Sequence, residues 1–371
     1  MKPVETLTQT HPKTLIVGIH SPTNPSKDIQ SYYDEFVNLV TSDGIIYDES
    51  FFTRLRSIDP AYYLTKGKVE ELTELCRKLE IEEVIVSEIL SPQQERNLSE
   101  ILRCRVYDRT QLILEIFEKG AQTAEGKTQV ELAMLQHRKS RLAGRGISMS
   151  QQAGRIGTRG PGETAKEKEL QHIERSSVKL QRDLDKLAKT RETQRKQRLG
   201  ENVPHICLIG YTNAGKSTIL NALTKSEVLA ENRLFATLDT TTRELYISKR
   251  KVGIISDTVG FIQQLPHNLI EAFKSTLSEL NYAHLLLHVI DSADSNWEYH
   301  IRVVMEVLKE LDIDKPILYV FNKIDMVADR ASFERAVEKY PSRVLVSSLS
   351  KEGLMPLIEF LHEWEIPQRA K

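Results

Sequence analysis

Apolar and polar positions along the first 120 residues alternate in a pattern that predicts short strands separated by amphipathic helices. The predicted strands are 14–19, 44–48, 82–88 and 104–108, and the predicted helices are 31–40, 68–80 and 91–102. In the first helix, one side is formed by Tyr33, Phe36, Val37 and Val40. Ser91 and Pro92 suit the N-cap and first residue of the last helix. Strands that alternate with helices indicate a small, mostly parallel α/β sheet, so residues 1–120 are assigned to an N-terminal α/β domain.

A more regular strand–loop–helix alternation begins at residue 201 and continues to the end of the chain. The predicted strands are 205–210, 244–248, 251–257, 283–291, 316–322 and 343–348, with helical segments among and after them. This order is typical of a doubly wound α/β domain, which we assign to residues 201–371.

The residues between these domains, 121–200, have a different pattern. Two helical segments flank 143–162, which holds six glycines, three arginines and no large apolar cluster, and is therefore predicted to be a mobile loop. After that loop, a heptad-like seam is formed by Leu170, Ile173, Ser177, Leu180, Leu184 and Leu187. The simplest interpretation is an antiparallel helical hairpin with the Gly/Arg loop at its tip. The alternative is a seam that packs on a neighbouring domain.

Charge is distributed unevenly along the chain. Residues 137–200 contain 17 Lys and Arg against 7 Asp and Glu, which gives +10, so the rest of the chain carries −11 of the total of −1. A basic stretch of this kind is either a solvated helix face or a surface for a polyanion. Aromatic residues make up only 6%, which argues against a protein built on many base-stacking platforms.

Cysteine usage and hydropathy narrow the class of protein further. Cys76, Cys104 and Cys207 are far apart and form no CxxC pair, which predicts reduced thiols rather than a disulfide or zinc site. No apolar run approaches the ~20 residues that span a bilayer, and the first 15 residues lack an apolar signal core. We expect a cytoplasmic monomer without integral membrane contact, with a peripheral position at a membrane left open.

The first motif with clear chemistry runs from Gly210 to Ser217 and matches GxxxxGK[ST] between a predicted strand and a predicted helix. Its backbone N–H groups would surround a β-phosphate, Lys216 would neutralise β/γ oxygens, and Ser217 would ligate Mg²⁺. Asn213 within this loop suits either K⁺ coordination beside the phosphates or a turn required by the backbone.

Two further motifs follow predicted strands. Asp257 opens DTVG, where its carboxylate would hold the magnesium shell and the Gly260 amide would meet a γ-phosphate. Asp325 ends NKID, where it would accept hydrogen bonds from N1 and N2 of guanine, a donor pair that adenine does not offer. Asn322 would support the phosphate loop, Lys323 would cover the base, and the amide of Ser348 would contact guanine.

The segment 227–243 occupies the position of a first switch, whose threonine would bind Mg²⁺. Spacing alone leaves four candidates open, namely Thr237, Thr240, Thr241 and Thr242. After DTVG, Phe261 stands where many small GTPases carry a water-orienting glutamine, so intrinsic hydrolysis should be slow. Gln263 and Gln264 are weak candidates for that role.

Several segments resemble the HflX family, in the Obg–HflX group of translation-factor-related P-loop GTPases. They are GYTNAGKST (210–218), LFATLDTTTR (234–243), DTVGFI (257–262) and NKID (322–325), with KGKVEEL (66–72), DRTQLILEIF (108–117), EGKTQVELA (125–133) and GTRGPGET (157–164) upstream. The resemblance implies GTP hydrolysis coupled to binding of the large ribosomal subunit, and ribosome dissociation or rescue under stress. It also implies that the hairpin reaches rRNA and that Thr237 is the switch threonine.

The motifs and the resemblance together predict which residues contact the nucleotide. The predicted nucleotide contacts are Gly210, Tyr211, Thr212, Asn213, Ala214, Gly215, Lys216, Ser217, Thr218, Phe235, Ala236, Thr237, Leu238, Asp239, Asp257, Thr258, Val259, Gly260, Asn322, Lys323, Ile324, Asp325, Ser347, Ser348 and Leu349. Lys216, Thr237, Gly260 and Asn213 are the expected catalytic residues, and Ser217 and Thr237 the metal ligands. The expected cofactors are GTP or GDP, Mg²⁺ and, through Asn213, K⁺.

The chain departs from many relatives in one respect, because only 352–371 follows the last predicted guanine loop. Functions of an extra C-terminal domain are therefore not expected. Some relatives use ATP through the N-terminal region, but the sequence contains no second phosphate loop. Two alternatives stay open: a GTPase in large-subunit biogenesis, and an RNA-binding or RNA-remodelling protein regulated by nucleotide.

Overall fold

The computed structural model describes residues 11–24, 28–144, 161–198, 203–224, 234–235, 241–248, 250–264, 269 and 277–364. The chain forms two compact units. One consists of Met1–Glu115 with Arg138–Lys168, and the other of Ile116–His137 with Glu169–Lys371.

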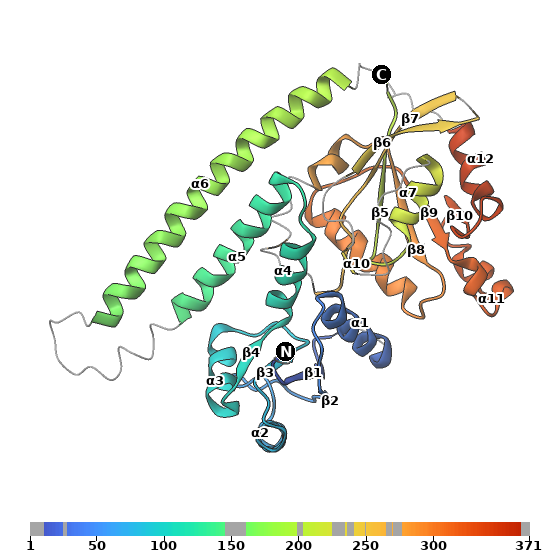
Figure 1. Cartoon of the computed structure of the whole chain (residues 1–371). Helices are drawn as coiled ribbons and strands as arrows, with labels where there is room; N and C mark the ends of the chain where they lie inside the picture. The colour runs from blue at the N-terminus through green and yellow to red at the C-terminus, as the bar shows by residue number, and fades with distance from the viewer. Residues whose placement is uncertain are drawn as a thin grey trace, which may run out of the picture. The chain divides into compact units, whose positions relative to one another are not determined.

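The first unit contains a four-stranded sheet in which every strand pairing is parallel (Figure 1). Its strands are β1 (Thr14–His20), β2 (Glu49–Arg54), β3 (Glu83–Val86) and β4 (Arg105–Tyr107), in the order β2-β1-β3-β4. All seven residues of β1 are buried, as expected for a central parallel strand with both faces covered.

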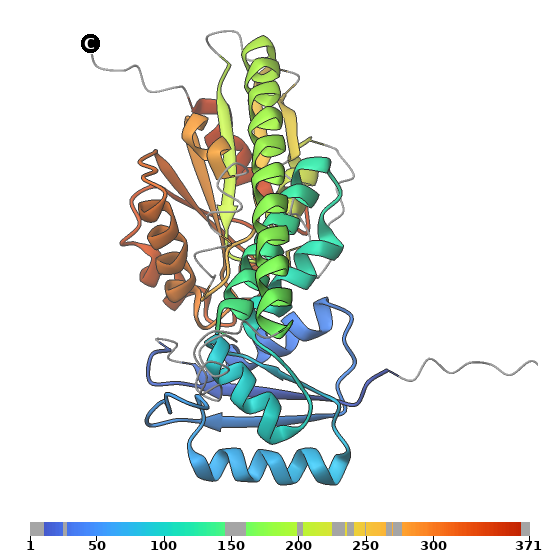
Figure 2. The same ribbon diagram turned by 90° about the vertical axis from the view of Figure 1, so that its left-hand side faces the viewer.

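Helices cover both faces of this sheet. Helices α2 (Lys66–Leu79) and α3 (Pro92–Leu102) share one hydrophobic cluster with Leu15, Val17 and Ile19 of β1. On the opposite face, a Cβ added to Gly18 would meet Phe52 and Tyr33, and Tyr33 belongs to α1 (Ile29–Ser42). Figure 2 shows the light-blue α2 beneath the strands of this sheet.

Local sequence signals explain where some of these elements begin. Ser91 is the N-cap of α3 and Pro92 lies in its first turn, as the sequence predicts, and Ser91 also forms a reciprocal capping box with Gln94. The strand predicted at 44–48 is wrong, because β2 begins only at Glu49. The Asp48 side chain accepts a hydrogen bond from the amide of Thr14, one residue before the pairing of Leu15 with Glu49 begins.

The second unit contains a six-stranded sheet in the order β10-β9-β8-β5-β7-β6. The strands are β5 (His205–Gly210), β6 (Thr241–Ile247), β7 (Arg250–Asp257), β8 (Leu285–Asp291), β9 (Ile317–Asn322) and β10 (Arg343–Leu345). Only β6 is antiparallel to its neighbour among these described strands. The doubly wound α/β domain predicted from the sequence is confirmed.

The helices of this unit lie on both sides of its sheet. Helices α7 (Lys216–Thr224) and α12 (Met355–Glu363) share one hydrophobic cluster with β5 and β8, through residues such as Ile219 and Leu357. Helices α10 (Trp297–Glu310) and α11 (Arg330–Val337) pack in a separate cluster around Phe321. The carboxyl ends of the parallel strands are therefore the edge at which loops are free to form a site.

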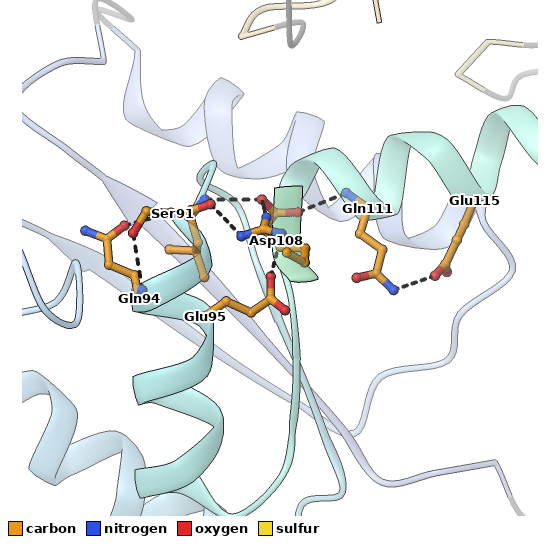
Figure 3. A network of polar contacts seen from close by, with 8 residues as sticks. Ser91, Gln94, Glu95, Asp108, Gln111 and Glu115 are labelled. Atoms are coloured by element: carbon orange, nitrogen blue, oxygen red, sulfur yellow. Dashed lines mark hydrogen bonds and ion pairs between the residues drawn. The ribbon is translucent and has the colours of Figure 1, made fainter. Parts of the chain in front are cut away.

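The middle region forms three helices: α4 (Arg109–Gly120), α5 (Ala124–Gly144) and α6 (Pro161–Arg198). Asp108 caps the start of α4 by accepting from the amide of Gln111 at 2.9 Å (Figure 3). The region before residue 142, which is predicted to be largely helical, forms α4 and α5 with an interruption at 121–123, where Thr123 accepts from the amide of Gly126.

Helix α6 is one unbroken helix of 38 residues (Figure 2). Ile173 and Leu184 of the predicted seam are buried, and the other seam residues are half-buried. Most of the predicted Gly/Arg loop, residues 145–160, lies outside the described residues. The arrangement of α5 and α6 as a hairpin stays a prediction.

Candidate functional site

The loop from β5 into α7 requires glycine at both of its ends. Gly210 has φ +149°, and a Cβ there would lie 2.2 Å from the carbonyl oxygen of Val289. Gly215 has φ +96°, and its Cβ would lie 2.3 Å from Nδ2 of Asn322. Asn213 also has left-handed backbone, with φ +60°, so the loop has a backbone reason for asparagine at this position.

Lys216 starts α7 with its side chain folded back across this loop. Its Nζ donates to the carbonyl oxygens of Gly210 at 3.1 Å and Tyr211 at 2.8 Å. Burial lowers the pKa of Lys216 to about 8, and the nearby Asp257 carboxylate opposes this shift. A buried ammonium group favours an anionic ligand, as expected for a phosphate-binding lysine.

Ser217 and the end of β7 bring hard oxygen atoms together. The Ser217 hydroxyl donates to Oδ2 of Asp257 at 2.7 Å, and Asp257 is fully buried. Thr258 donates to the carbonyl oxygen of Leu208 at 2.8 Å, which fixes the chain just after the aspartate. A Cβ on Gly260 would lie 3.0 Å from Lys216 Nζ and 2.9 Å from the Thr212 methyl carbon, so the glycine lies close to both residues.

Asn322 links three loops at the carboxyl end of β9. Its Nδ2 donates to the carbonyl oxygen of Ala214 at 2.9 Å, and its Oδ1 accepts from the amide of Ser348 at 3.1 Å. The expected support of the phosphate loop by Asn322 is therefore present. The Ser348 amide, which the sequence assigns to guanine, is engaged with this side chain instead.

Lys323 spans the gap between two neighbouring loops. Its Nζ donates to the carbonyl oxygen of Asn213 at 2.9 Å and to Oδ2 of Asp291 at 2.6 Å. Asp325 lies exposed two residues later, and Leu349 on the adjacent loop is 82% exposed. The loop of Leu349 is held by Gly353, whose carbonyl oxygen accepts from the amide of Ser347 at 3.0 Å. An exposed carboxylate beside an open apolar side chain suits a planar ligand with paired N–H donors.

The candidate threonines of the first switch separate into two groups. Thr241 and Thr242 lie in β6, where Thr241 pairs with Asp257 and Thr242 lies 2.8 Å from the Ser256 hydroxyl. Thr237 and Thr240 lie outside the described residues, as do Ala236, Leu238 and Asp239. Phe235 is described and buried.

The residue that follows DTVG is a buried phenylalanine, which cannot orient a water molecule. Phe261 is 2% exposed, its amide donates to the carbonyl oxygen of Gly210, and its own carbonyl accepts from the amide of Thr212. Gln263 is also buried, and its amide donates to the Tyr211 hydroxyl at 2.8 Å. In this conformation the side chain of Gln263 does not lie open to solvent.

Three residues that the sequence analysis did not select support the site. Asp291 accepts a hydrogen bond from Lys323. Its position at the end of a buried strand is the sequence signal that could have identified it as a site residue. His300 stacks on the ring of Tyr211, with centroids 3.8 Å apart and planes at 10°. His288 lies buried on β8, and burial, with a smaller effect of the Lys216 charge, lowers its pKa to about 3.

Comparison with protein-family models gives three consecutive matches. Residues 30–118 match "GTP-binding GTPase N-terminal", residues 120–198 match "GTP-binding GTPase Middle Region", and residues 205–323 match "50S ribosome-binding GTPase". The three matches follow one another along most of the chain.

Curated relatives resemble the chain over most of its length. A GTPase HflX from Lacrimispora saccharolytica is 43% identical over 340 residues, which are 91% of this chain and 80% of the relative. A GTPase HflX from Escherichia coli strain K12 is 41% identical over 349 residues, with 94% and 82% covered. Among solved structures, a complex of SsGBP with GDP has a TM-score of 0.51 at 23% identity and covers 95% of this chain and 98% of that one, which supports the fold. None of the described helices is long and apolar enough to cross a bilayer.

Proposed function

Because the chain belongs to the HflX family of GTPases, we propose that it binds the large ribosomal subunit and couples its GTP cycle to ribosome dissociation or rescue, above all under stress. The chain is a GTP-binding GTPase, which converts GTP to GDP and phosphate. The observation that carries the ribosomal part is the match of residues 205–323 to a family described as 50S ribosome-binding GTPases.

The residues around the phosphate loop suggest how GTP would be held. The amides of 210–218 would surround the phosphates, and Lys216 would neutralise their β/γ oxygens. Gly260 lies close to Lys216 Nζ, so its amide is our candidate sensor of the γ-phosphate. The base would lie against Lys323 and Leu349, with Asp325 accepting from guanine N1 and N2.

The donor set fits Mg²⁺. Ser217 and Asp257 offer a hydroxyl and a carboxylate oxygen within 2.7 Å of each other, and Mg²⁺ prefers such oxygen ligands with phosphates and water completing its shell. Among the described residues no group of three His, Cys, Asp or Glu side chains could hold a metal alone, which agrees with a site completed by nucleotide. We assign Ser217 and Thr237 as ligands, and Asp257 to their support. Bound Mg²⁺ would neutralise charge that develops on the phosphates.

The basic middle region would provide the contact with rRNA. Residues 137–200 carry +10, and the described part of α6 exposes Lys179, Arg182 and Lys189 along its length. Rows of basic side chains bind phosphate groups with an affinity that falls as salt rises. The acidic remainder of the chain, at −11, would be repelled by the same RNA, so the charge distribution favours contact through this region.

The ribosomal proposal is tested by the steady-state GTPase rate with and without purified large subunits, with small subunits as the matched control. We expect large subunits alone to stimulate hydrolysis at least about tenfold, the rate equivalent of 1.4 kcal/mol. Sedimentation with GTP should then convert intact ribosomes to subunits. Equal rates with either subunit would contradict the proposal, and association with precursor particles only would favour a role in biogenesis.

The role of Asn213 in K⁺ binding is tested separately. A cation beside the phosphates would stabilise charge in the transition state, so hydrolysis should be faster in KCl than in NaCl at equal ionic strength. The variant Asn213→Gly keeps the left-handed backbone, which has φ +60°, and removes only the side chain. We expect it to lose the difference between the two salts. Equal wild-type rates in both salts would leave Asn213 with its backbone role alone.

A further inference from the structure

An aromatic contact joins helix α4 to a residue of the segment assigned to the first switch. Phe117, near the end of α4, meets Phe235 edge to face, with ring centroids 4.6 Å apart and planes at 83°. Both side chains are buried, at 1% and 5% exposure. Pairs with this geometry stabilise each other beyond the apolar area that they bury. The contact lies within one compact unit, since Ile116–His137 groups with Glu169–Lys371.

The backbone of Phe235 is an independent sign that this contact is under constraint. Its φ is +58°, in the left-handed region that bulky L-residues rarely adopt because Cβ approaches the carbonyl oxygen. Such a conformation persists only where the surroundings fix it, and it often marks a functional segment. A Cβ added to Gly120 would lie 3.8 Å from the carbonyl oxygen of Phe235, so the end of α4 also lies against this backbone.

Phe235 is close in sequence to the residue that we assign as the metal-binding threonine. Thr237 follows it by two residues, so their Cα atoms are at most about 7 Å apart. Fixing Phe235 therefore restrains the chain two residues before Thr237. This inference rests on the proposed role of Thr237.

We propose that Phe117 is a positioning residue for GTP hydrolysis, which acts through Phe235 from a helix outside the GTPase domain. Helix α4 is suited to this role because its first residue is also fixed. The Arg109 side chain is fully buried and pairs with Glu35 at 2.5 Å. The helix between Arg109 and Phe117 is continuous, so Phe117 lies on the same helix as a residue that is held by Glu35.

The first test compares Phe117→Ala with Leu112→Ala, a truncation of another buried side chain on the same helix. We expect Phe117→Ala to lower kcat for GTP about threefold to tenfold, the rate equivalent of losing one aromatic pair. Its Kd for GDP should change less than about twofold, because GDP lacks the γ-phosphate that the first switch would contact. Leu112→Ala should lose thermal stability but keep its kcat. Rates are measured without ribosomes, so an absence of ribosomal stimulation would contradict the proposed function and leave this test intact.

A double-mutant cycle decides whether Phe117 acts through Phe235. If it does, Phe235→Ala should lower kcat by a similar factor, and the double variant should lose no more than either single variant. Phe117→Leu keeps apolar packing and should recover part of the loss, and it replaces Phe117→Ala if that variant fails to fold. An unchanged kcat in Phe117→Leu and Phe117→Ala, losses that multiply in the double variant, or a matching loss of GDP affinity would each overturn the proposal.

Discussion

Asp325 is an exposed carboxylate whose expected partner is the guanine edge of the nucleotide. Replacing it with asparagine exchanges one acceptor oxygen for an amide donor, which would face the N1 and N2 donors of guanine. We expect Asp325→Asn to weaken GTP binding at least about a hundredfold, since a site built for paired donors rejects a mismatch strongly. Xanthine nucleotides, which carry a carbonyl oxygen in place of the amino group, should then bind better than GTP. Competition titrations with a fluorescent nucleotide measure both effects.

The matched control for this substitution is Asp329→Asn. Asp329 is also exposed, and its side chain accepts from the amide of Ser332 at 3.0 Å as the N-cap of α11. Asparagine caps helices nearly as well as aspartate, so this variant removes the same charge without disturbing the fold. Its nucleotide preference should match that of the wild type. Equal wild-type affinity for ATP and GTP would contradict the assignment of Asp325.

His288 should make the stability of the GTPase domain sensitive to acid. Its pKa falls from an ordinary 6.5 to about 3 because of burial and, to a lesser extent, the Lys216 charge. Between pH 6.5 and 3 the unfolded chain takes up a proton at this histidine that the folded chain does not bind. Stability is therefore retained above pH 6.5 and lost as the pH falls, by up to about 1.4 kcal/mol per pH unit from this group.

Thermal unfolding between pH 7 and 5 tests this prediction with His288→Leu. Nδ1 of His288 has no hydrogen-bond partner among the described residues, so leucine removes the titration without leaving a partner unsatisfied. We expect the variant to lose less stability than the wild type on acidification. His362→Leu, at an exposed position of α12, should lose as much stability as the wild type over the same pH range. If the wild type and His288→Leu lose equal stability between pH 7 and 5, other groups cause the acid sensitivity.

The sequence predicts those site residues that follow one another along the chain. The loop of Gly210–Ser217 is recognisable because glycine, lysine and serine recur at fixed spacing in one strand–helix turn. Asp291 and His300 are different, because their roles depend on which strands are neighbours in the sheet. Asp291 reaches Lys323 because β8 pairs with β9, and His300 reaches Tyr211 because α10 lies beside β5. Such pairings are properties of the fold that no local pattern contains.

Within the first unit, a buried ion network fixes the carboxyl-terminal part of α5. Arg141 donates to Asp108 at 2.5 Å and to the carbonyl oxygen of Leu90 at 2.8 Å, and it pairs with Glu95 at 2.9 Å. Figure 3 shows Asp108 at the centre of this network, with Glu95 and Ser91 beside it. Asp108 is fully buried, so its charge depends on this guanidinium and on backbone amides.

We expect Arg141→Met to destabilise the chain by about 2–4 kcal/mol, because it leaves a buried carboxylate without its cation. The double variant Arg141→Met with Asp108→Asn should be more stable than Arg141→Met alone. Asparagine removes the charge and still accepts from the amide of Gln111 at the N-cap of α4. Urea unfolding measures these differences, with Lys139→Met as the exposed control on the same helix. A double variant no more stable than the single one would contradict the role of the Asp108 charge.

The limits of prediction differ among elements. Strands and helices with strong periodicity, such as β1 and α1, lie where the sequence predicts them. The strand predicted at 44–48 is wrong because an apolar run does not reveal where pairing with β1 begins, which is at Leu15 and Glu49. The break between α4 and α5 is missed because residues 121–123 are compatible with helix, and only the cap at Thr123 marks the new start.

The charge distribution of the whole chain allows a prediction about partner binding. A near-neutral total of −1 hides +10 in residues 137–200, so contact with RNA should be local and should depend on salt. The triple variant Lys179→Gln, Arg182→Gln and Lys189→Gln removes three exposed charges from α6. The logarithm of affinity falls with the logarithm of salt concentration, and each lost phosphate contact makes this fall less steep by about 0.7–0.9. The triple variant should therefore make it less steep by about 2–3.

Binding to purified large subunits between about 50 and 200 mM KCl, where such contacts weaken most visibly, measures this slope. The matched control neutralises three basic residues on α2 in the first unit, with Lys66→Gln, Arg77→Gln and Lys78→Gln. Both variants change the net charge by the same amount, so a long-range effect of total charge would shift both slopes equally. A change confined to the α6 variant would identify α6 as a surface that contacts RNA. Equal slopes for that variant and the wild type would instead favour α6 as a solvated helix, whose basic residues serve solubility rather than recognition.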